Sequence, residues 1–242
     1  MIEKSFIFLP GIGTKKEKSI NKQGIKSWNS FLKAKKVNGI SDKKKDLLNK
    51  EIEQAKQKLY GDELSYFLKN LPQKENYRLY EFFKDEVVFL DIEVDSNRNI
   101  IIIGLFDGFE SKFLVKGVNL YRDILKKELE KYRLIVTFNG SSFDLPLIEK
   151  KLNLPITLSH IDLKHLCRNV GLKGSLKEIE TQLNLKRPTH LFGHPVDAWK
   201  AAHASGDDRY IKATLNYNEE DLVNLRPILD YCYKKLKERS NT

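Results

Sequence analysis

The segment that most constrains the fold is 87–93, in which four apolar residues lead directly into Asp91 and Glu93, separated only by Ile92. Side chains alternate between the two faces of a β-strand, so the two carboxylates share one face while Leu90 and Ile92 point to the other. Two like charges at the end of a buried strand are unfavourable unless a positive charge neutralises them, and a divalent cation does so most simply. The segment therefore predicts half of a metal site, and the alternative is the solvated acidic face of an ordinary strand.

Apolar segments alternate with helical ones after this strand. Four of them have the composition of strands: 100–106, 112–115, 134–138 and 156–158. Asp107 and Gly108 predict a tight hairpin between the first two, and a helix is expected over 119–131. Three antiparallel strands followed by strand–helix units indicate an α/β fold, with a mixed five-stranded sheet flanked by helices.

The first third of the chain has a different character. Residues 1–80 carry 18 Lys and Arg against 9 Asp and Glu, which accounts for nearly all of the net charge of +10. Apolar residues at helical spacing over 42–71 predict one long helix followed by a second, and Pro72 ends the helical order. We therefore expect a small all-α region at 1–76 ahead of a larger domain at 77–242. The basic surplus favours nucleic acid as a partner, and the alternative is that lysine richness only reflects genome composition and surface solubility.

Two glycines open this basic region. Gly11 and Gly13 alternate with apolar residues and lead into Lys15 and Lys16, where helical spacing begins. Glycine leaves room for a phosphate to approach backbone N–H groups at a helix start. The stretch 11–28 resembles a helix-hairpin-helix module, which binds the nucleic-acid backbone independently of sequence, so these four residues are candidate substrate-binding residues. The alternative is an ordinary turn between two packed helices.

Further acidic positions extend the predicted metal site. Asp144 follows the strand at 134–138 and falls in the first turn of the next helix, near the edge of the sheet where open α/β proteins bind ligands. Tyr217 and Asp221 are four residues apart in a helical segment and therefore share one face. Asp144 alone has the alternative role of stabilising the helix dipole, and the Tyr217 and Asp221 pair alone is a weak signal.

In their order and spacing, these segments resemble the three motifs of DEDD-type 3′–5′ exonucleases of the tyrosine subclass. The motifs are Asp91 to Glu93, Asn139 to Asp144, and Tyr217 to Asp221. The second is especially similar to proofreading exonuclease domains of family B DNA polymerases, and the stretch 160–218 resembles stand-alone prokaryotic exonucleases. The resemblance covers about 77–232. It implies a ribonuclease H-like fold and a metal-dependent exonuclease that releases nucleoside 5′-monophosphates.

The resemblance also implies roles for individual residues. Asp91, Glu93 and Asp221 would hold one divalent cation, and Asp91 and Asp144 would hold a second. All-oxygen ligands suit Mg²⁺ or Mn²⁺, and such a pair of ions activates a water and stabilises the leaving 3′-oxygen. Tyr217 would orient the attacking water. The expected catalytic residues are these four acids and this tyrosine.

Substrate contacts are expected from a second set of residues. Asn139 and Phe143 would meet the terminal nucleotide, with a place in the core as the alternative for Phe143. Lys177 is a candidate for phosphate contact, as are Lys173 and Arg187, although basic residues on a surface usually lack a specific partner.

Other polar residues are expected to have structural roles. Asp162 follows a strand and opens a helix, so helix capping is favoured over metal binding. The five histidines show no ligand spacing together with a carboxylate: His160, His165, His190, His194 and His203. Asn216 stands where the sister subclass has a histidine, so no imidazole base is expected there.

The expected function is thus metal-dependent 3′–5′ exonuclease activity on nucleic acid, with single-stranded or 3′-ended DNA favoured and RNA as the other substrate. The alternatives are a structure-specific endonuclease and a non-catalytic nucleic-acid-binding factor. No apolar run approaches the ~20 residues that span a bilayer, so we expect no membrane contact and a cytoplasmic location. Cys167 and Cys232 fit no zinc pattern and suggest no disulfide framework, which agrees with a reducing compartment.

Overall fold

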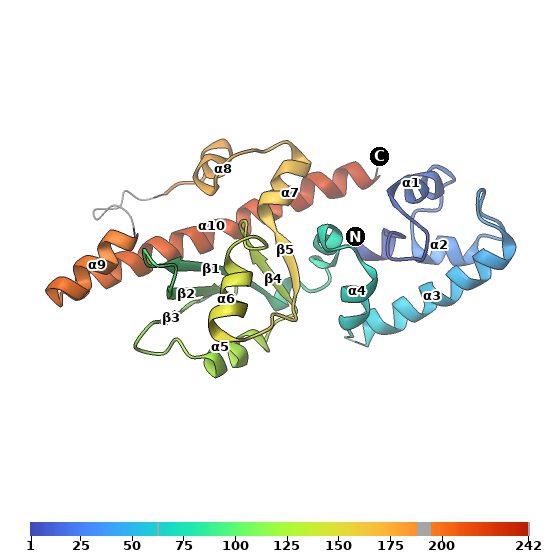
Figure 1. Ribbon diagram of the computed structural model, residues 1–242. Coiled ribbons are helices and arrows are strands. Elements are labelled where there is room, and N and C mark those ends of the chain that lie inside the picture. Colours follow the sequence, from blue (N-terminus) through green and yellow to red (C-terminus); the bar gives the residue numbers. More distant parts are fainter. Residues whose placement is uncertain (62, 188–194, 242) are drawn as a thin grey trace. The chain divides into compact units, whose positions relative to one another are not determined.

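The computed structural model describes residues 1–61, 63–187 and 195–241 (Figure 1). The chain forms two compact units, Met1–Phe82 and Phe83–Thr242, whereas the sequence was expected to divide between residues 76 and 77. A 3₁₀ helix, Gln73–Leu79, runs across that expected position. Residues 77–82 therefore belong to the first unit.

The described part of the first unit contains four α-helices: α1 (Thr14–Lys22), α2 (Trp28–Lys33), α3 (Asp42–Tyr60) and α4 (Ser65–Asn70). The last two confirm the long helix and the shorter helix predicted for 42–71. Helix α2 begins at a capping box, in which Ser27 and Ser30 exchange hydrogen bonds. The core of the unit is aromatic: Trp28 stacks on Phe67 with ring centroids 6.4 Å apart, and its indole N–H donates to the carbonyl of Ser5 at 2.7 Å.

A buried acid of α1 ties the chain start to this unit. Glu17 accepts hydrogen bonds from the Phe6 backbone N–H at 2.7 Å and from the Ser5 hydroxyl at 3.0 Å. Its second oxygen pairs with Arg78 at 3.1 Å. A buried carboxylate is tolerated when it is paired and hydrogen-bonded in this way, so Glu17 acts as an anchor within an otherwise basic segment.

The second unit is built on a five-stranded sheet. Its strands are β1 (Val87–Val94), β2 (Ile100–Phe106), β3 (Ser111–Val115), β4 (Leu134–Thr137) and β5 (Ser159–Asp162), in the spatial order β3-β2-β1-β4-β5. Strand β1 is antiparallel to β2 and parallel to β4. The mixed five-stranded sheet expected from the sequence is therefore confirmed.

The fifth strand is displaced from its expected position. The prediction of a strand at 156–158 was wrong, because it followed apolar character alone, whereas β5 carries two polar side chains that find local partners. His160 meets the hydroxyl of Thr137 at 2.9 Å, and Asp162 caps the next helix. Ile156 and Leu158 lie partly buried against the core instead.

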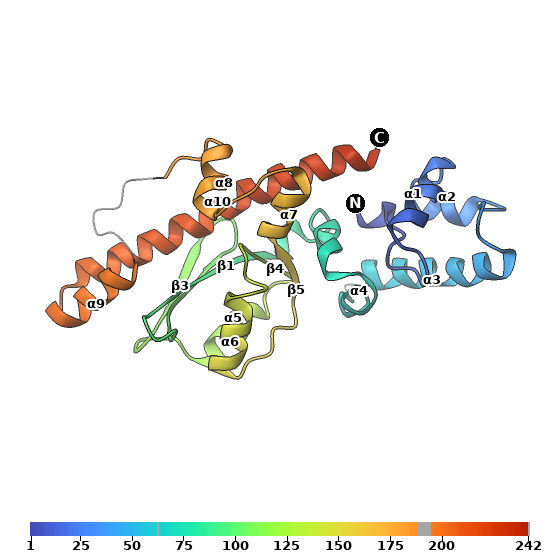
Figure 2. The same ribbon diagram turned by 45° about the horizontal axis from the view of Figure 1, so that its top comes forward.

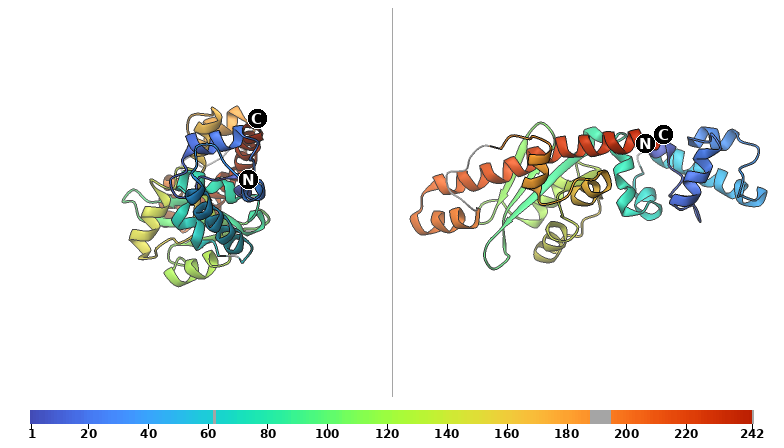
Figure 3. Two further views of the ribbon diagram at one scale, coloured as in Figure 1. Left: turned by 90° about the vertical axis from the view of Figure 1, so that its right-hand side faces the viewer. Right: turned by 90° about the horizontal axis from the view of Figure 1, so that it is seen from above.

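Helices cover both faces of the sheet (Figures 1 and 2). On one face, α5 (Arg122–Leu129) and α6 (Asp144–Leu152) share a core cluster with Leu90 and Ile92; α5 is shorter than the helix predicted at 119–131. On the other face, α9 (Pro195–Ser205) and α10 (Asp208–Asn241) contact β1. Figure 3 shows α10, in red, running past the sheet with α9 beside it.

Helices α7 (Leu163–Val170) and α8 (Leu176–Gln182) also pack against α10. The side chains of Asp91 and Glu93 point to the α10 face of β1, because Leu90 and Ile92 occupy the opposite face. Acids on β1 and residues of α10 are thus brought together by the fold. Within the described residues, no helix combines the length and the apolar character needed to cross a membrane.

Candidate active site

Three carboxylates from two distant parts of the chain meet between β1 and α10. Asp91, Glu93 and Asp221 each offer an oxygen atom, and these three atoms all lie within 4.8 Å of one another. Strand alternation places the first two on one face, and α10 crosses that face to add the third. Such a group of hard oxygen ligands fits Mg²⁺ or Mn²⁺.

Asp144 lies beside this group of three but is not part of it. It is buried in the first turn of α6, and its carboxylate accepts a hydrogen bond from the backbone N–H of Ile92. Its negative charge is among the causes that raise the pKa of Asp91 and of Glu93. The structure therefore places all four predicted acids at one end of β1.

Burial raises the pKa values of these four acids, and for Asp91 and Glu93 the charges of the other acids add to the effect. Burial is the largest cause in each case, and it raises the pKa of Glu93 to about 8 and the pKa of Asp144 to about 7. The pKa of Asp91 is raised well above its usual range by burial and then by the charges of Asp144, Glu93 and Asp221. A cluster with these properties is neutralised either by protons or by a cation, which is the expected behaviour of a metal site.

A buried amide supports the two acids of β1. The side-chain Nδ2 of Asn218, which is fully buried on α10, donates to Oδ2 of Asp91 at 2.7 Å, and its hydrogen bond to Glu93 lowers the pKa of that residue. Gly104 of β2 lies opposite Asp91 in the sheet register and leaves the space that the amide fills. Sequence reasoning did not select Asn218, although a glycine inside an apolar strand is a signal that another group approaches closely.

An arginine and its own acid partner complete the site. Arg187 forms an ion pair with Asp221, and its Nε and Nη2 donate to the two oxygens of Glu180 at 3.0 and 2.9 Å. Glu180 is buried on α8. The charge of Arg187 opposes the effect of burial on the pKa of Asp221, which is nevertheless raised. The sequence indicated Arg187 only as a candidate basic residue and did not indicate Glu180.

Two cations lie close to the ring of Tyr217. The ammonium of Lys177 is 5.0 Å from the centre of its ring, and the guanidinium carbon of Arg187 is 5.5 Å from it. Lys177 also lowers the pKa of Glu93 and of Asp221, so it lies within electrostatic reach of the carboxylates. The predicted substrate-binding lysine and the predicted tyrosine are therefore neighbours at the site.

The loop that precedes α6 is held by Asp162. Its carboxylate accepts hydrogen bonds from the backbone N–H groups of Asn139 at 2.9 Å and of Ser141 at 3.1 Å, and also from the Ser141 hydroxyl. Asn139 takes a left-handed conformation, with φ of 68°. Asp162 also accepts from the N–H of Lys164, which confirms its expected capping role. Phe143 is half-buried: part of its side chain packs against the core cluster of the sheet, and the rest is accessible.

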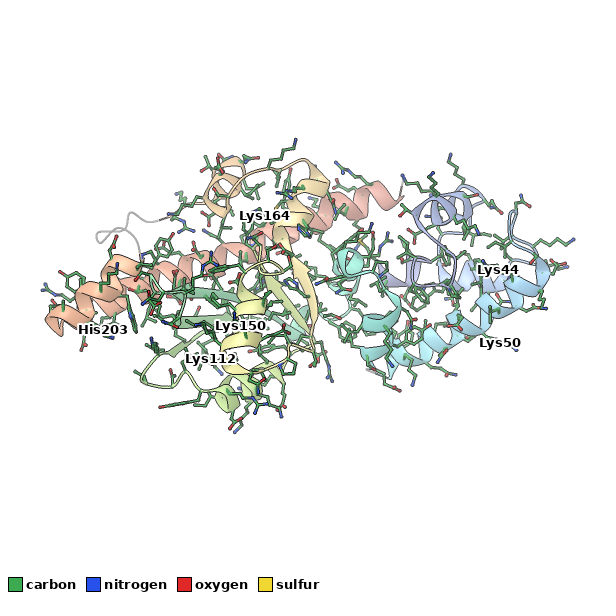
Figure 4. All side chains as sticks on the ribbon, in the orientation of Figure 1. Lys44, Lys50, Lys112, Lys150, Lys164 and His203 are labelled. Atoms are coloured by element: carbon green, nitrogen blue, oxygen red, sulfur yellow. The ribbon has the colours of Figure 1, made fainter. Side chains whose placement is uncertain are left out.

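The glycine-rich turn belongs to the first unit. Gly11 has φ of +70°, Gly13 is the N-cap of α1, and Lys15 and Lys16 are exposed in its first turn. Turns and the 3₁₀ helix Ile2–Lys4 lead into this turn and α1 follows it, so the alternative of an ordinary turn between two packed α-helices was wrong. The ammonium of Lys44, labelled in Figure 4, approaches Gly11 so closely that a Cβ there would lie 2.8 Å from it.

The histidines of the described residues stand apart from the carboxylate group. Burial lowers the pKa of His160 to about 4, so this side chain is neutral where it meets Thr137. His203, labelled in Figure 4, meets the carbonyl of Trp199 within α9 at 3.0 Å. His190 and His194 lie outside the described residues.

The part of the chain that carries these residues matches a known protein family. Residues 88–233, more than half of the chain, match the family model of the RNase H superfamily. The chain belongs to the RNase H superfamily. The matched range contains the whole sheet except Val87, and it includes all four acids, Asn218 and Arg187. A search of curated proteins finds no match.

Two solved structures are similar to this superfamily member at low sequence identity. The family B DNA polymerase from the hyperthermophilic archaeon Pyrobaculum calidifontis aligns with a TM-score of 0.46 at 15% sequence identity, over 60% of this chain and 24% of the polymerase. Escherichia coli RNase D, an exoribonuclease involved in structured RNA processing, aligns with a TM-score of 0.34 at 19% identity, over 68% of this chain and 48% of RNase D. The chain spans about a quarter and about half of the length of these two proteins.

Proposed function

We propose that this RNase H superfamily member is a metal-dependent 3′–5′ exonuclease of the DEDD type, tyrosine subclass, which hydrolyses phosphodiester bonds and releases nucleoside 5′-monophosphates. The observation that carries the proposal is the convergence of Asp91, Glu93 and Asp221 within 4.8 Å, with Asp144 beside them. In this proposal DNA is the favoured substrate and RNA the alternative. A non-catalytic binding factor would not require buried acids whose mutual repulsion costs free energy.

The proposed cofactors are two divalent cations, Mg²⁺ or Mn²⁺, held by the four acids. When bound, such ions lower the pKa of a water and stabilise the charge that develops on the leaving oxygen. Asn218 keeps Asp91 and Glu93 in place, and the N–H of Ile92 orients Asp144. These contacts preorganise the carboxylates, so that little rearrangement is needed when substrate arrives.

Tyr217 is the proposed residue that orients the attacking water through its hydroxyl. Lys177 and Arg187 both lie close to its ring, and these two cations favour a nearby anionic substrate. Asn139 and Phe143 precede Asp144 in the loop that Asp162 holds, and they are the proposed contacts to the terminal nucleotide. The role of Lys177 is attraction of the phosphate backbone.

The region 1–76 is proposed to bind the nucleic-acid backbone through Gly11, Gly13, Lys15 and Lys16. The exposed lysines at the start of α1 and the basic surplus of this region support the proposal. Exchange of Lys15 and Lys16 for glutamate is expected to weaken oligonucleotide binding and to reduce its dependence on salt. Filter binding at two salt concentrations measures both effects, and unchanged binding would leave the region with a structural role only.

The decisive experiment uses oligonucleotides labelled at either end. Matched single- and double-stranded DNA and RNA are incubated with Mg²⁺ or Mn²⁺, and the products are sized over time. The proposal expects stepwise shortening from the 3′ end and mononucleotide products, all abolished in Asp91→Asn and in Asp221→Asn. Asp123→Asn, an exposed acid of α5, is the matched control and is expected to retain activity.

Two other outcomes would replace the proposal. Internal cuts that appear before shortening of the 3′ end indicate an endonuclease. Tight binding without hydrolysis under either metal indicates a nucleic-acid-binding factor.

A further inference from the structure

Arg187 is a buried arginine whose orientation is determined by another acid. Only 14% of its side chain is exposed, and its Nε and Nη2 form a two-point ion pair with Glu180, whose side chain is 3% exposed. The amide of Asn224 donates to the same glutamate at 2.9 Å. Two parallel hydrogen bonds to a buried carboxylate hold the planar guanidinium in one orientation. Arg187 is therefore a preorganised group rather than a mobile surface cation.

The guanidinium presents its remaining atoms to the carboxylate site. Nη2 also contacts Oδ1 of Asp221, and the guanidinium lies over the ring of Tyr217. Among the residues that the structure describes, Nη1 is buried without a hydrogen-bond acceptor. A buried N–H donor without an acceptor is unfavourable, and in a site of this kind it indicates an acceptor that comes from a ligand.

Charge and geometry restrict that ligand. The ligand must carry a hydrogen-bond acceptor, and it approaches a guanidinium that shares the ring of Tyr217 with the ammonium of Lys177. Guanidinium groups bind phosphate oxygens through short charge-assisted hydrogen bonds. A phosphodiester that enters beside Asp221 provides such an oxygen, whereas a neutral base or sugar does not match the charge.

We propose that Arg187, oriented by Glu180, binds a non-bridging oxygen of the phosphate that links the 3′-terminal nucleotide to the rest of a nucleic-acid strand. This inference rests on the proposed function and adds a substrate-binding residue to it. Glu180 is a positioning residue, because it acts only through Arg187. Recognition is directed to the phosphate and is the same for every base at that position.

The alternative is that Arg187 only neutralises the acids. The two roles differ in what removal of the guanidinium changes. If Arg187 merely balances charge, its loss alters cation affinity and stability and leaves nucleotide affinity unchanged. If it binds phosphate, its loss weakens the binding of any ligand that carries the phosphate, including the mononucleotide product in the absence of metal.

The test measures binding and turnover in the full-length protein. The probes are a nucleoside 5′-monophosphate and the matching unphosphorylated nucleoside, titrated calorimetrically in chelator, together with a single-stranded oligonucleotide under turnover conditions with Mn²⁺. The variants are Arg187→Ala, Arg187→Lys and Glu180→Gln. The control is Arg226→Ala, which removes a contact to the carbonyl of Gly108 in the β2–β3 hairpin.

The expected result is a loss of monophosphate affinity of roughly tenfold or more in Arg187→Ala, with nucleoside affinity unchanged. Arg187→Lys keeps the positive charge but lacks the planar guanidinium with its paired N–H donors, so it retains only part of the wild-type affinity for the monophosphate. Glu180→Gln is expected to weaken the same ligand less, because Arg187 remains but is less firmly oriented. The KM for the oligonucleotide rises in all three variants, Mn²⁺ affinity stays within about threefold of the wild-type value, and Arg226→Ala behaves as wild type.

Failure of this inference is distinct from failure of the proposed function. If wild-type protein hydrolyses oligonucleotides and Arg187→Ala binds the monophosphate as wild type does, the role of Arg187 is overturned while the nuclease stands. If wild-type protein does not hydrolyse oligonucleotides, but Arg187→Ala binds the monophosphate more weakly than wild type does, the phosphate site stands without the nuclease. If Arg187→Ala does not fold, Arg187→Lys is the variant that tests the proposal. A monophosphate affinity and a KM equal to the wild-type values in Arg187→Lys would overturn it.

Discussion

Gly104 of β2 leaves the space that the side-chain amide of Asn218 occupies. A Cβ on Gly104 would collide with Oδ1 of Asn218 and would lie 2.5 Å from Cδ1 of Leu222. Gly104 is also the register partner of Asp91, so its Cβ would point to the same face of the sheet as that carboxylate. The absence of a side chain at this position lets α10 approach closely enough for Asn218 to reach Asp91.

This close approach predicts that Gly104→Ala is destabilising. The added methyl group forces Asn218 and Leu222 away from the sheet, and overpacking of this kind typically costs about 1–3 kcal/mol of the free energy of unfolding. Urea denaturation monitored by circular dichroism measures the loss. Asn218→Ala removes one of the two colliding side chains, so the double variant should be less destabilised than the sum of the single variants, by roughly 0.5 kcal/mol or more. Strictly additive free energies would show that the two residues do not compete for one space.

Asn218 is also predicted to control cation affinity. Asn218→Ala removes the donor to Asp91 and the hydrogen bond that lowers the pKa of Glu93, so both carboxylates become less well ordered and protons compete more strongly. Loss of such a supporting contact commonly weakens metal binding by about 10–100-fold. Calorimetric titration with Mn²⁺ at pH 7 measures the change.

Asn216→Ala is the matched control, because Asn216 is an exposed residue of the same helix. It should bind Mn²⁺ as wild type does. Equal Mn²⁺ affinities in Asn218→Ala and Asn216→Ala would show that Asn218 does not contribute to metal binding.

The pairing of residues within each element of the site could be predicted from local pattern, whereas the expectation that these elements meet came from the family resemblance. The alternation in β1 placed Asp91 and Glu93 on one face, and the four-residue spacing placed Tyr217 and Asp221 on one face of a helix. Each of these inferences uses a period that holds within a single element. They required no knowledge of how the elements pack.

The supporting residues could not be predicted in this way. The roles of Asn218, Glu180 and Arg187 depend on how α8 and α10 pack against the sheet, which no local period encodes. Arg187 also resembles an ordinary surface cation in the sequence, and its burial follows from the position of Glu180. The misplaced fifth strand has a related cause, since His160 and Asp162 are polar residues whose partners come from β4 and the loop after it.

The stability of the metal-free protein is predicted to fall as the pH rises. Glu93 and Asp144 have pKa values of about 8 and about 7 in the folded protein, above the usual values of unfolded carboxyl groups near 4. Between those values the folded protein binds more protons than the unfolded chain, so the free energy of unfolding decreases with each increase in pH. The decrease begins near pH 4 and ends near pH 8. Chemical denaturation in chelator at intervals over this range measures the slope.

Glu93→Gln should flatten this dependence and raise the stability of the metal-free protein at pH 8 by about 1–3 kcal/mol, because a neutral amide replaces a repelled charge. Glu130→Gln, whose side chain is 62% exposed on the surface, is the control and should follow wild type. A wild-type stability that rises from pH 5 to pH 8 in chelator would contradict the raised pKa values.

The same linkage predicts that divalent cations stabilise the protein more at high pH than at low pH. Cations and protons compete for the same carboxylates, so the affinity for Mg²⁺ or Mn²⁺ increases as the pH passes the pKa values of Asp144 and Glu93. Excess ligand at about 100 times its dissociation constant adds roughly 2.7 kcal/mol. The increase in melting temperature on addition of Mn²⁺ should therefore be larger at pH 8 than at pH 5.5. Asp91→Asn should show almost no increase at either pH, and an equal increase in that variant would indicate cation binding elsewhere.

Asp162 is predicted to have the opposite pH dependence, because hydrogen bonds favour its charged form. Burial opposes ionisation, but hydrogen bonds from Ser141 and Asn139 outweigh it and lower the pKa of Asp162 below its usual value. Its contribution to stability is present above the pKa of an unfolded aspartate, near 3.9, and is lost as the pH falls through the lower folded value.

Asp162→Asn replaces one of two accepting oxygens with a donor and should cost about 1–3 kcal/mol of the free energy of unfolding at pH 7. The difference from wild type should shrink below pH 4, as shown by urea denaturation at pH 7 and pH 3. Asp123→Asn serves as the exposed control; a difference for Asp162→Asn that is equal at both pH values would mean that the loop before α6 does not depend on this charge.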